Sequence, residues 1–210
     1  MTVTDIRKME YKGASMIKFS CIILAGGNGT RFGTKKQFIE WNGKPLWEHV
    51  YDKCIQVSDD IQTDFKKYPH LGRMGAVMYG ARKAKYPIVV ILEAARPAVT
   101  VNHIEHIAFL AHTFDSVSYA IPSTDSLYDV SQKKHVNRKD IYQLQIPQAF
   151  NRKLLLRAFK LRNKKITYTS ETILMQDALG IKPHLLPGDY NLWKVTYPSD
   201  LVVIKEMCKK

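Results

Sequence analysis

Glycines and cations are concentrated between positions 24 and 37, where the sequence is LAGGNGTRFGTKKQ. An apolar stretch at 21–24 leads directly into four glycines within eight residues. Glycine adopts positive φ without strain and lets main-chain N–H groups approach a ligand closely. Successive amides in such a turn form an anion-binding concavity, and Arg31, Lys35 and Lys36 add positive charge beside it. The segment therefore predicts a polyphosphate site.

Two known glycine signatures do not fit this segment. A P-loop requires Lys-Ser or Lys-Thr after its glycines, and neither pair is present. The dinucleotide fingerprint G-x-G-x-x-G matches Gly27, Gly29 and Gly33 only with one extra residue in the last gap. A glycine-rich turn between a strand and a helix, with no ligand, is the structural alternative.

The segment resembles the nucleotide-binding signature of sugar- and polyol-phosphate nucleotidyltransferases. The nearest branch is the cytidylyltransferases that act on 2-C-methyl-D-erythritol 4-phosphate and on ribitol 5-phosphate. Four further segments resemble the same family, in the family's order: EAARP at 93–97, IPSTDS at 121–126, QIPQAF at 145–150 and WKVTYPSDL at 193–201. Together the five matches extend from residue 22 to residue 201.

The resemblance implies transfer of CMP from CTP to a phosphorylated alcohol, with release of pyrophosphate. The attacking group is already an ionised phosphate oxygen, so the reaction needs fixed cations and a metal. By resemblance, Arg31, Lys36 and Lys194 stabilise the charge of the transition state, and Glu93 holds Mg²⁺. The family carries Asp where this chain has Glu93. A strand-end carboxylate paired with Arg96 is the alternative for Glu93.

The resemblance also implies two sets of binding residues. Those that contact the nucleotide are Ala25, Gly26, Gly27, Asn28, Gly29, Gly72, Arg73, Ala76 and Ala94. Ala76 stands where the family has serine, which removes a hydroxyl from the segment that contacts cytosine and ribose in the family. Those that contact the acceptor are Arg96, Ser126 and Arg138, the last two acting across a homodimer. An exposed basic hairpin without a ligand is the alternative for Arg138.

Apolar segments alternate with helical patterns along the chain. Strands are predicted at 19–25, 87–92, 116–121 and 193–196, and helices from 45, at 74–84, 104–111 and 170–179, and from 200. This alternation predicts an α/β, Rossmann-like fold, a mostly parallel twisted sheet with helices on both faces. The resemblance makes it GT-A-like. The family has two strands within the range that corresponds to 57–71, and we expect one of them to be reduced or missing here. The polar, basic segment 129–146 predicts a projecting excursion, and the resemblance makes it the arm for dimerisation and acceptor binding.

Bulk composition predicts one domain in a chain of 210 residues. We divide it into a polar N-terminal extension, 1–16, and a single nucleotidyltransferase domain, 17–210. No apolar run is long enough to cross a bilayer, and the scattered Cys21, Cys54 and Cys208 have no metal-ligand spacing. We therefore expect a cytoplasmic protein with reduced thiols and no membrane partner.

A net charge of +13 favours an anionic partner but does not identify it. A nucleic-acid-binding domain is one alternative. We expect no nucleic acid, because the cations mark ordered loop positions and no helix-turn-helix or RNA-binding signature is present. A second alternative is a nucleotide-binding member of the same fold with weakened catalysis. Glu93, Ala76, Ser126 and the pair Ser170-Glu171, where the erythritol enzymes have Asp-Asp, favour another polyol phosphate as acceptor.

Overall fold

Two buried strands form the centre of the fold in the computed structural model, which describes residues 17–27, 29–63 and 72–207. β1 (Phe19–Leu24) and β5 (Ile88–Glu93) pair in parallel, with Phe19 opposite Ile88. Successive side chains of a strand point to opposite faces, and both strands are apolar at nearly every position. Both faces of the sheet therefore need helices to cover them. The predicted extension 1–16, Asn28 and Cys208 lie outside the described residues.

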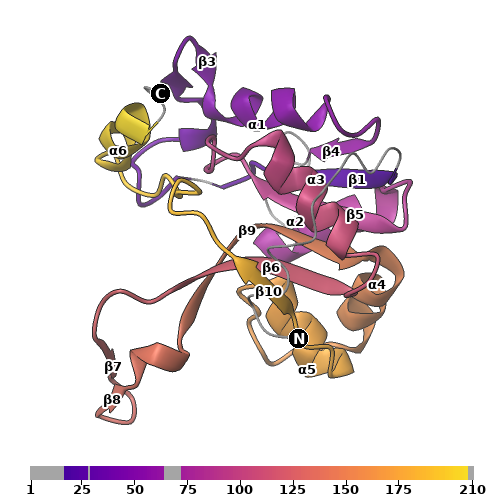
Figure 1. The fold of residues 1–210 in the computed structure, drawn as a ribbon, viewed down its shortest axis with the longest axis vertical. Helices are drawn as coiled ribbons and strands as arrows, with labels where there is room; N and C mark the ends of the chain where they lie inside the picture. Colours follow the sequence, from indigo (N-terminus) through magenta and orange to yellow (C-terminus); the bar gives the residue numbers. More distant parts are fainter. Residues whose placement is uncertain (1–16, 28, 64–71, 208–210) are drawn as a thin grey trace.

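The central sheet has six strands in the order β10-β6-β9-β5-β1-β4 (Figure 1). The others are β4 (Ile61–Thr63), β6 (Ser116–Pro122), β9 (Tyr142–Asn151) and β10 (His184–Pro187). β9 runs antiparallel to both of its neighbours, and the other five strands share one direction. The prediction of a mostly parallel α/β sheet is confirmed. β9 is reversed because it returns along β6 from the arm.

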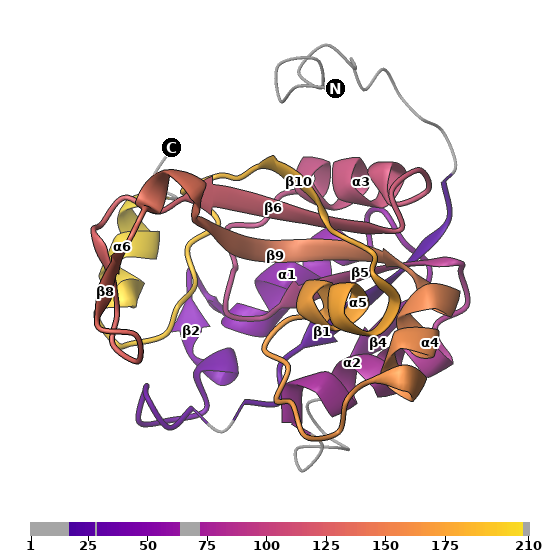
Figure 2. The ribbon, with the colours of Figure 1, turned by 90° about the horizontal axis from the view of Figure 1, so that it is seen from below.

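Helices cover both faces of the sheet (Figure 2). α1 (Leu46–Cys54) and α3 (Val101–Leu110) pack on one face, against alternate residues of β1 and β5 such as Ile23 and Val90. α2 (Gly72–Lys83), α4 (Arg152–Leu161) and α5 (Glu171–Leu179) pack on the other face, against residues such as Ile22 and Ile91. The three layers leave the carboxyl ends of β1 and β5 open on one side.

A third apolar cluster lies beside those strand ends. It joins Trp41, Leu46, Val195 and Ile204, so it fixes α6 (Asp200–Met207) against the β2–β3 hairpin. That hairpin consists of β2 (Glu40–Trp41) and β3 (Lys44–Pro45), preceded by the short 3₁₀ helix η2 (Lys36–Phe38). The packing of this cluster positions the two segments that contain the predicted site residues Lys36 and Lys194.

The predicted strand at 193–196 is wrong. That segment forms no strand, although the Val195 N–H donates to the Ala95 carbonyl at 2.8 Å and the Val195 side chain is buried. The edge strand next to β6 is instead β10, which the sequence does not predict because it is short and ends in proline. Helix α4 was also missed, although Asn151 caps it by accepting from the Lys153 and Leu154 N–H groups.

The arm extends from the far ends of β6 and β9, at the lower left of Figure 1. It contains the hairpin of β7 (Leu127–Asp129) and β8 (Lys134–Val136) and the 3₁₀ turn η4 (Arg138–Asp140). The predicted range 129–146 is placed too late. β7 begins before it, and Gln145 and Ile146 at its end are buried in β9 within the sheet.

None of the helices formed by the described residues is both long enough and apolar enough to cross a membrane.

Candidate active site

A cavity of about 400 Å³ opens at the carboxyl ends of β1 and β5. This is where open α/β sheets bind ligands. Its walls come from the loop after β1, the first turn of α2, the end of β5 and the segment before α6. The lining residues are Leu24, Ala25, Gly26, Gly27, Arg31, Lys36, Gln37, Gly72, Arg73, Ala76, Glu93, Ala94, Ala95 and Lys194. Arg31, Lys36 and Lys194, the three cations predicted for the transition state, share this one cavity.

The glycine-rich loop after β1 is closed by its own backbone. The Phe32 and Gly33 N–H groups both donate to the Gly29 carbonyl, at 2.9 and 2.8 Å. Gly29 has φ +69°, and a Cβ added there would lie 1.6 Å from the Thr34 carbonyl oxygen. Only glycine therefore fits that position. Gly29 is not among the lining residues, so it shapes the loop rather than the cavity wall.

Gln37 is a lining residue to which sequence reasoning gave no role. Its side chain is buried, and its amide nitrogen donates to the Gly27 carbonyl at 3.2 Å. This hydrogen bond ties the beginning of the glycine loop to η2. The sequence feature that could have indicated this role is the Lys-Lys-Gln run directly after the glycines, because it places a hydrogen-bonding side chain next to the glycine loop.

The two site lysines connect the walls of the cavity. Lys36 Nζ donates to the Val195 carbonyl at 2.7 Å, and Lys194 Nζ donates to Glu93 Oε1 at 2.9 Å. Burial, and then repulsion from Lys194, lower the pKa of Lys36 below its ordinary value. The loop after β1, the end of β5 and the segment before α6 are therefore held together by charged side chains around an anion-sized space.

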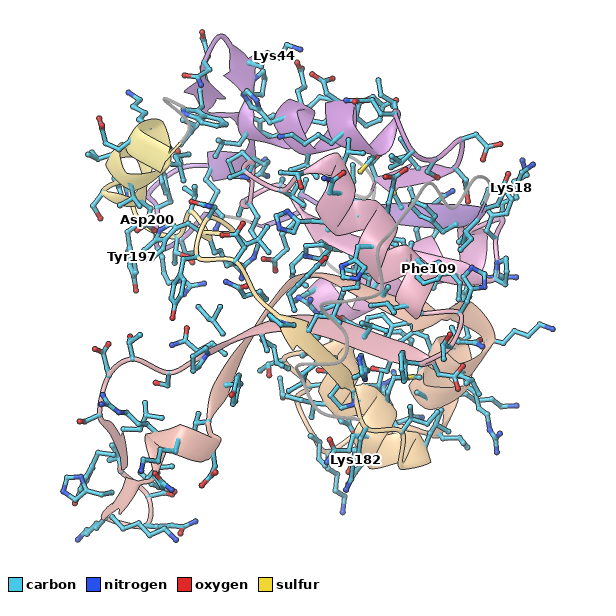
Figure 3. All side chains as sticks on the ribbon, viewed as in Figure 1. Lys18, Lys44, Phe109, Lys182, Tyr197 and Asp200 are labelled. Atoms are coloured by element: carbon cyan, nitrogen blue, oxygen red, sulfur yellow. The ribbon has the colours of Figure 1, made fainter. Side chains whose placement is uncertain are left out.

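Asp200 fixes the segment that carries Lys194. Its Oδ2 accepts from the Thr196 and Tyr197 N–H groups, both at 2.7 Å, at the start of α6. Figure 3 shows Tyr197 and Asp200 next to each other on the side of the molecule from which the arm projects. The chain between 193 and 199 thus has a defined path without strand pairing.

Glu93 is the only carboxylate among the described residues that line the cavity. It is 8% exposed and faces three cations: Lys194 Nζ at 2.9 Å, Arg96 Nε at 3.4 Å and Arg73 Nε at 3.7 Å. Burial alone would raise the pKa of Glu93, but attraction from Lys194, Arg96 and Arg73 keeps it below its ordinary value. Glu93 is therefore ionised, and the pairing with Arg96 weighed above as an alternative is present.

The first turn of α2 presents Gly72, Arg73 and Ala76 to the cavity. A helix N-terminus carries partial positive charge and suits an anionic ligand. Arg73 adds a full charge there and also donates through Nη1 to Oε1 of the buried Glu171. The predicted nucleotide residues Ala25, Gly26, Gly27, Gly72, Arg73, Ala76 and Ala94 all lie on the cavity wall.

The three predicted acceptor residues occupy two different places. Arg96 lies next to Glu93, and its Nη1 donates to the Leu192 carbonyl. Ser126 and Arg138 belong to the arm, are exposed, and do not line the cavity of their own chain. Arg138 Nη1 donates to the Thr124 carbonyl at the base of the arm. Their predicted role requires a second copy of the chain.

Two family models match the chain. The model for 2-C-methyl-D-erythritol 4-phosphate cytidylyltransferase matches residues 73–209, and the model for the MobA-like NTP transferase domain matches residues 21–63. The second match contains the glycine loop and Lys36. The first contains Glu93, Lys194 and the arm.

Similar proteins cover nearly the whole chain. The 2-C-methyl-D-erythritol 4-phosphate cytidylyltransferase of Aquifex aeolicus is 30% identical over 207 residues, covering 90% of this chain and 97% of its own. The protein of the same name from Thermotoga neapolitana is 30% identical over 217 residues, covering 90% and 96%. The crystal structure of the protein so named from Thermus thermophilus matches with a TM-score of 0.74 at 22% identity, over 91% of this chain and 98% of that one. The fold is therefore that of nucleotidyltransferases.

Proposed function

Because the chain belongs to the 2-C-methyl-D-erythritol 4-phosphate cytidylyltransferase family, we propose that it transfers CMP from CTP to a polyol phosphate and releases pyrophosphate. Membership makes the chain a nucleotidyltransferase that uses CTP. The acceptor and the role of each residue are the proposed part. The names of the relatives favour 2-C-methyl-D-erythritol 4-phosphate as the first acceptor to test, ahead of the ribitol-type phosphates that the substitutions in the sequence favour.

The observation that carries the proposal is the convergence of Arg31, Lys36 and Lys194 on one glycine-lined cavity. A triphosphate needs several positive groups around it, and negative charge increases at the α-phosphorus during transfer. Cations fixed in advance stabilise that charge without rearranging in the transition state. Lys36 and Lys194 are fixed in this way, by the Val195 carbonyl and by Glu93.

Mg²⁺ fits this site only together with the substrate. The described residues contain no cluster of three or more His, Cys, Asp or Glu side chains, so this part of the chain offers no cage of its own for a metal ion. Mg²⁺ is commonly held by one or two carboxylates and by substrate phosphates. Glu93 would be the protein ligand, and the ion would neutralise charge on the phosphate oxygens.

In this proposal, the arm of one chain completes the acceptor site of a second copy. It exposes large apolar side chains, with Tyr128, Ile141 and Tyr142 exposed and Val130 81% exposed. Exposed apolar groups of this kind favour burial in an interface. Ser126 and Arg138 would then reach the partner's cavity, where a bidentate guanidinium is suited to bind the acceptor phosphate.

A pyrophosphate-release assay tests the proposed function. The purified protein is incubated with Mg²⁺, each of the four NTPs, and a panel of 2-C-methyl-D-erythritol 4-phosphate, ribitol 5-phosphate and related polyol phosphates. We expect release with CTP and one acceptor, at a rate far above that without an acceptor. No release with any pair would favour the catalytically weakened alternative. Equal rates with CTP and UTP would show that the site does not select the base, as expected if the serine that Ala76 replaces provides this selectivity.

Replacing Arg138 with alanine is expected to raise KM for the acceptor roughly ten- to a hundredfold, because a charge-assisted hydrogen bond contributes about 1.5–3 kcal/mol. KM for CTP should stay unchanged, since Arg138 does not line the nucleotide cavity. Steady-state kinetics with each substrate varied in turn checks this. Lys139→Ala removes a neighbouring exposed cation and serves as the control. A rise in KM for CTP alone would contradict the role of the arm.

The rate is expected to fall at high pH earlier than an ordinary lysine would predict. Burial and Lys194 lower the pKa of Lys36, so its proton is lost at lower pH as the solution becomes alkaline. The pH profile of kcat/KM for CTP reports ionisations of the free enzyme. Lys36→Arg should move this alkaline limb to higher pH, because arginine stays protonated. A limb that does not move would show that another group controls it.

A further inference from the structure

Glu171 is a buried acid with no assigned role. It is 0% exposed and is the first residue of α5. Oε1 accepts from Arg73 Nη1, whereas Oε2 has no hydrogen-bond partner among the described residues. Burial, only partly offset by Arg73, raises the pKa of this carboxyl. A half-satisfied buried carboxylate costs stability, so its presence needs an explanation.

The two arginines beside Glu93 are both held from elsewhere. Arg73 is bound through Nη1 to Glu171, and Arg96 is bound through Nη1 to the Leu192 carbonyl. Each reaches Glu93 only with Nε, at 3.7 and 3.4 Å. Lys194 makes the shortest of the three contacts with Glu93, at 2.9 Å. The Nη1 atom of each guanidinium is thus anchored elsewhere, and only the lysine approaches Glu93 within 3 Å.

We propose that Glu171 is a positioning residue that holds the Arg73 guanidinium on the cavity wall, oriented toward the nucleotide and away from full pairing with Glu93. The inference rests on the proposed function, since it takes the nucleotide as the ligand of Arg73. Glu93 is the nearest other carboxylate to Arg73, so an Arg73 released by Glu171 would move onto it. That shift would move the positive charge of Arg73 away from the nucleotide. It would also pair Arg73 with Glu93, so that Arg73 would compete with Mg²⁺ for this carboxylate.

Calorimetric titration with CTP tests this role without requiring turnover. Glu171→Gln keeps the shape of the side chain but removes its charge, and we expect the Kd for CTP to rise about tenfold. Arg73→Gln should weaken binding by at least as much. If Glu171 acts through Arg73, the double variant should bind CTP no more weakly than Arg73→Gln alone. KM for the acceptor should not change in Glu171→Gln.

Asp115→Asn is the matched structural control. Asp115 accepts from Asn151 Nδ2 at 3.0 Å at the amino-terminal end of β6, away from the cavity. The Asp115→Asn substitution should lower the melting temperature without changing the Kd for CTP. If Glu171→Gln does not fold, Glu171→Asp is measured instead; it keeps the charge but retracts it by one methylene, and the same loss of affinity is expected.

Two results would overturn the inference: wild-type affinity for CTP in Glu171→Gln, or losses that add in the double variant. A wild-type protein that binds CTP but transfers no CMP would overturn the proposed function alone, because the binding cycle would still report on Glu171. A wild-type protein that binds no CTP would overturn both.

Discussion

Replacing Lys36 with alanine is expected to lower kcat by about 10²–10³, the range for removal of one donor to a transition-state anion. Lys194→Ala should have an effect of the same size. Both side chains line the cavity, and both are fixed before the substrate arrives. Single-turnover measurement of CMP transfer at saturating CTP separates this loss from weaker binding.

The loss of stability in Lys36→Ala should be limited to one hydrogen bond. Lys36 contributes one hydrogen bond, to the Val195 carbonyl, and a hydrogen bond from a charged group contributes about 1.5–3 kcal/mol. Lys44→Ala is the control. The exposed amine of Lys44 pairs with Asp52, and Lys44, which is labelled at the top of Figure 3, lies on the β2–β3 hairpin. Lys44→Ala should leave kcat unchanged. Parallel losses of folding and activity in Lys36→Ala would mark the lysine as structural.

The glycine loop and its cations could be predicted because their chemistry is local. Gly29 adopts positive φ and is followed by Arg31 and Lys36, so the sequence contains both the turn and the charge. Lys194 was added by resemblance, since nothing local brings residue 194 to residue 36. Their meeting depends on the Trp41 cluster, which packs α6 and the segment before it against the hairpin.

The boundary of the arm could not be predicted from polarity. Two of the three glutamines of β9, Gln145 and Gln148, are buried, because their amides have hydrogen-bond partners inside the fold. Gln145 Nε2 donates to the Asp189 carbonyl and Gln148 Nε2 to Ser118 Oγ, each at 3.0 Å. Polar residues with satisfied hydrogen bonds are compatible with a core strand. A reading based on hydrophobic pattern therefore extends the arm too far.

The pairing of Arg73 with Glu171 also could not be predicted from the sequence. The two residues are 98 positions apart, and each lies near the start of a different helix. Glu171 occurred in the sequence only as a departure from the family's Asp-Asp pair. The structure gives it a partner, because α5 and the first turn of α2 place both side chains beside Glu93.

Replacing Glu93 with glutamine is expected to have the largest combined effect. Its carboxylate is buried among Lys194, Arg96 and Arg73, and its removal leaves that positive cluster without its nearest countercharge. Breaking a buried ion pair by removing one partner costs about 3–5 kcal/mol. We therefore expect a clear fall in the urea midpoint, together with loss of Mg²⁺-dependent transfer by at least the factor expected for Lys36→Ala.

Glu93→Asp separates the two contributions. Aspartate keeps the charge, so most of the stability should return, whereas its carboxylate lies one methylene further from Lys194. If Glu93 is the Mg²⁺ ligand, the Mg²⁺ concentration for half-maximal rate should differ between Glu93→Asp and the wild type. The electron paramagnetic resonance spectrum of Mn²⁺ in the CTP complex should change in Glu93→Gln, because a carboxylate ligand is lost, and should stay close to that of the wild type in Glu93→Asp. An unchanged Mn²⁺ spectrum in Glu93→Gln would leave Glu93 only the role of a countercharge that holds Lys194 and the two arginines in place.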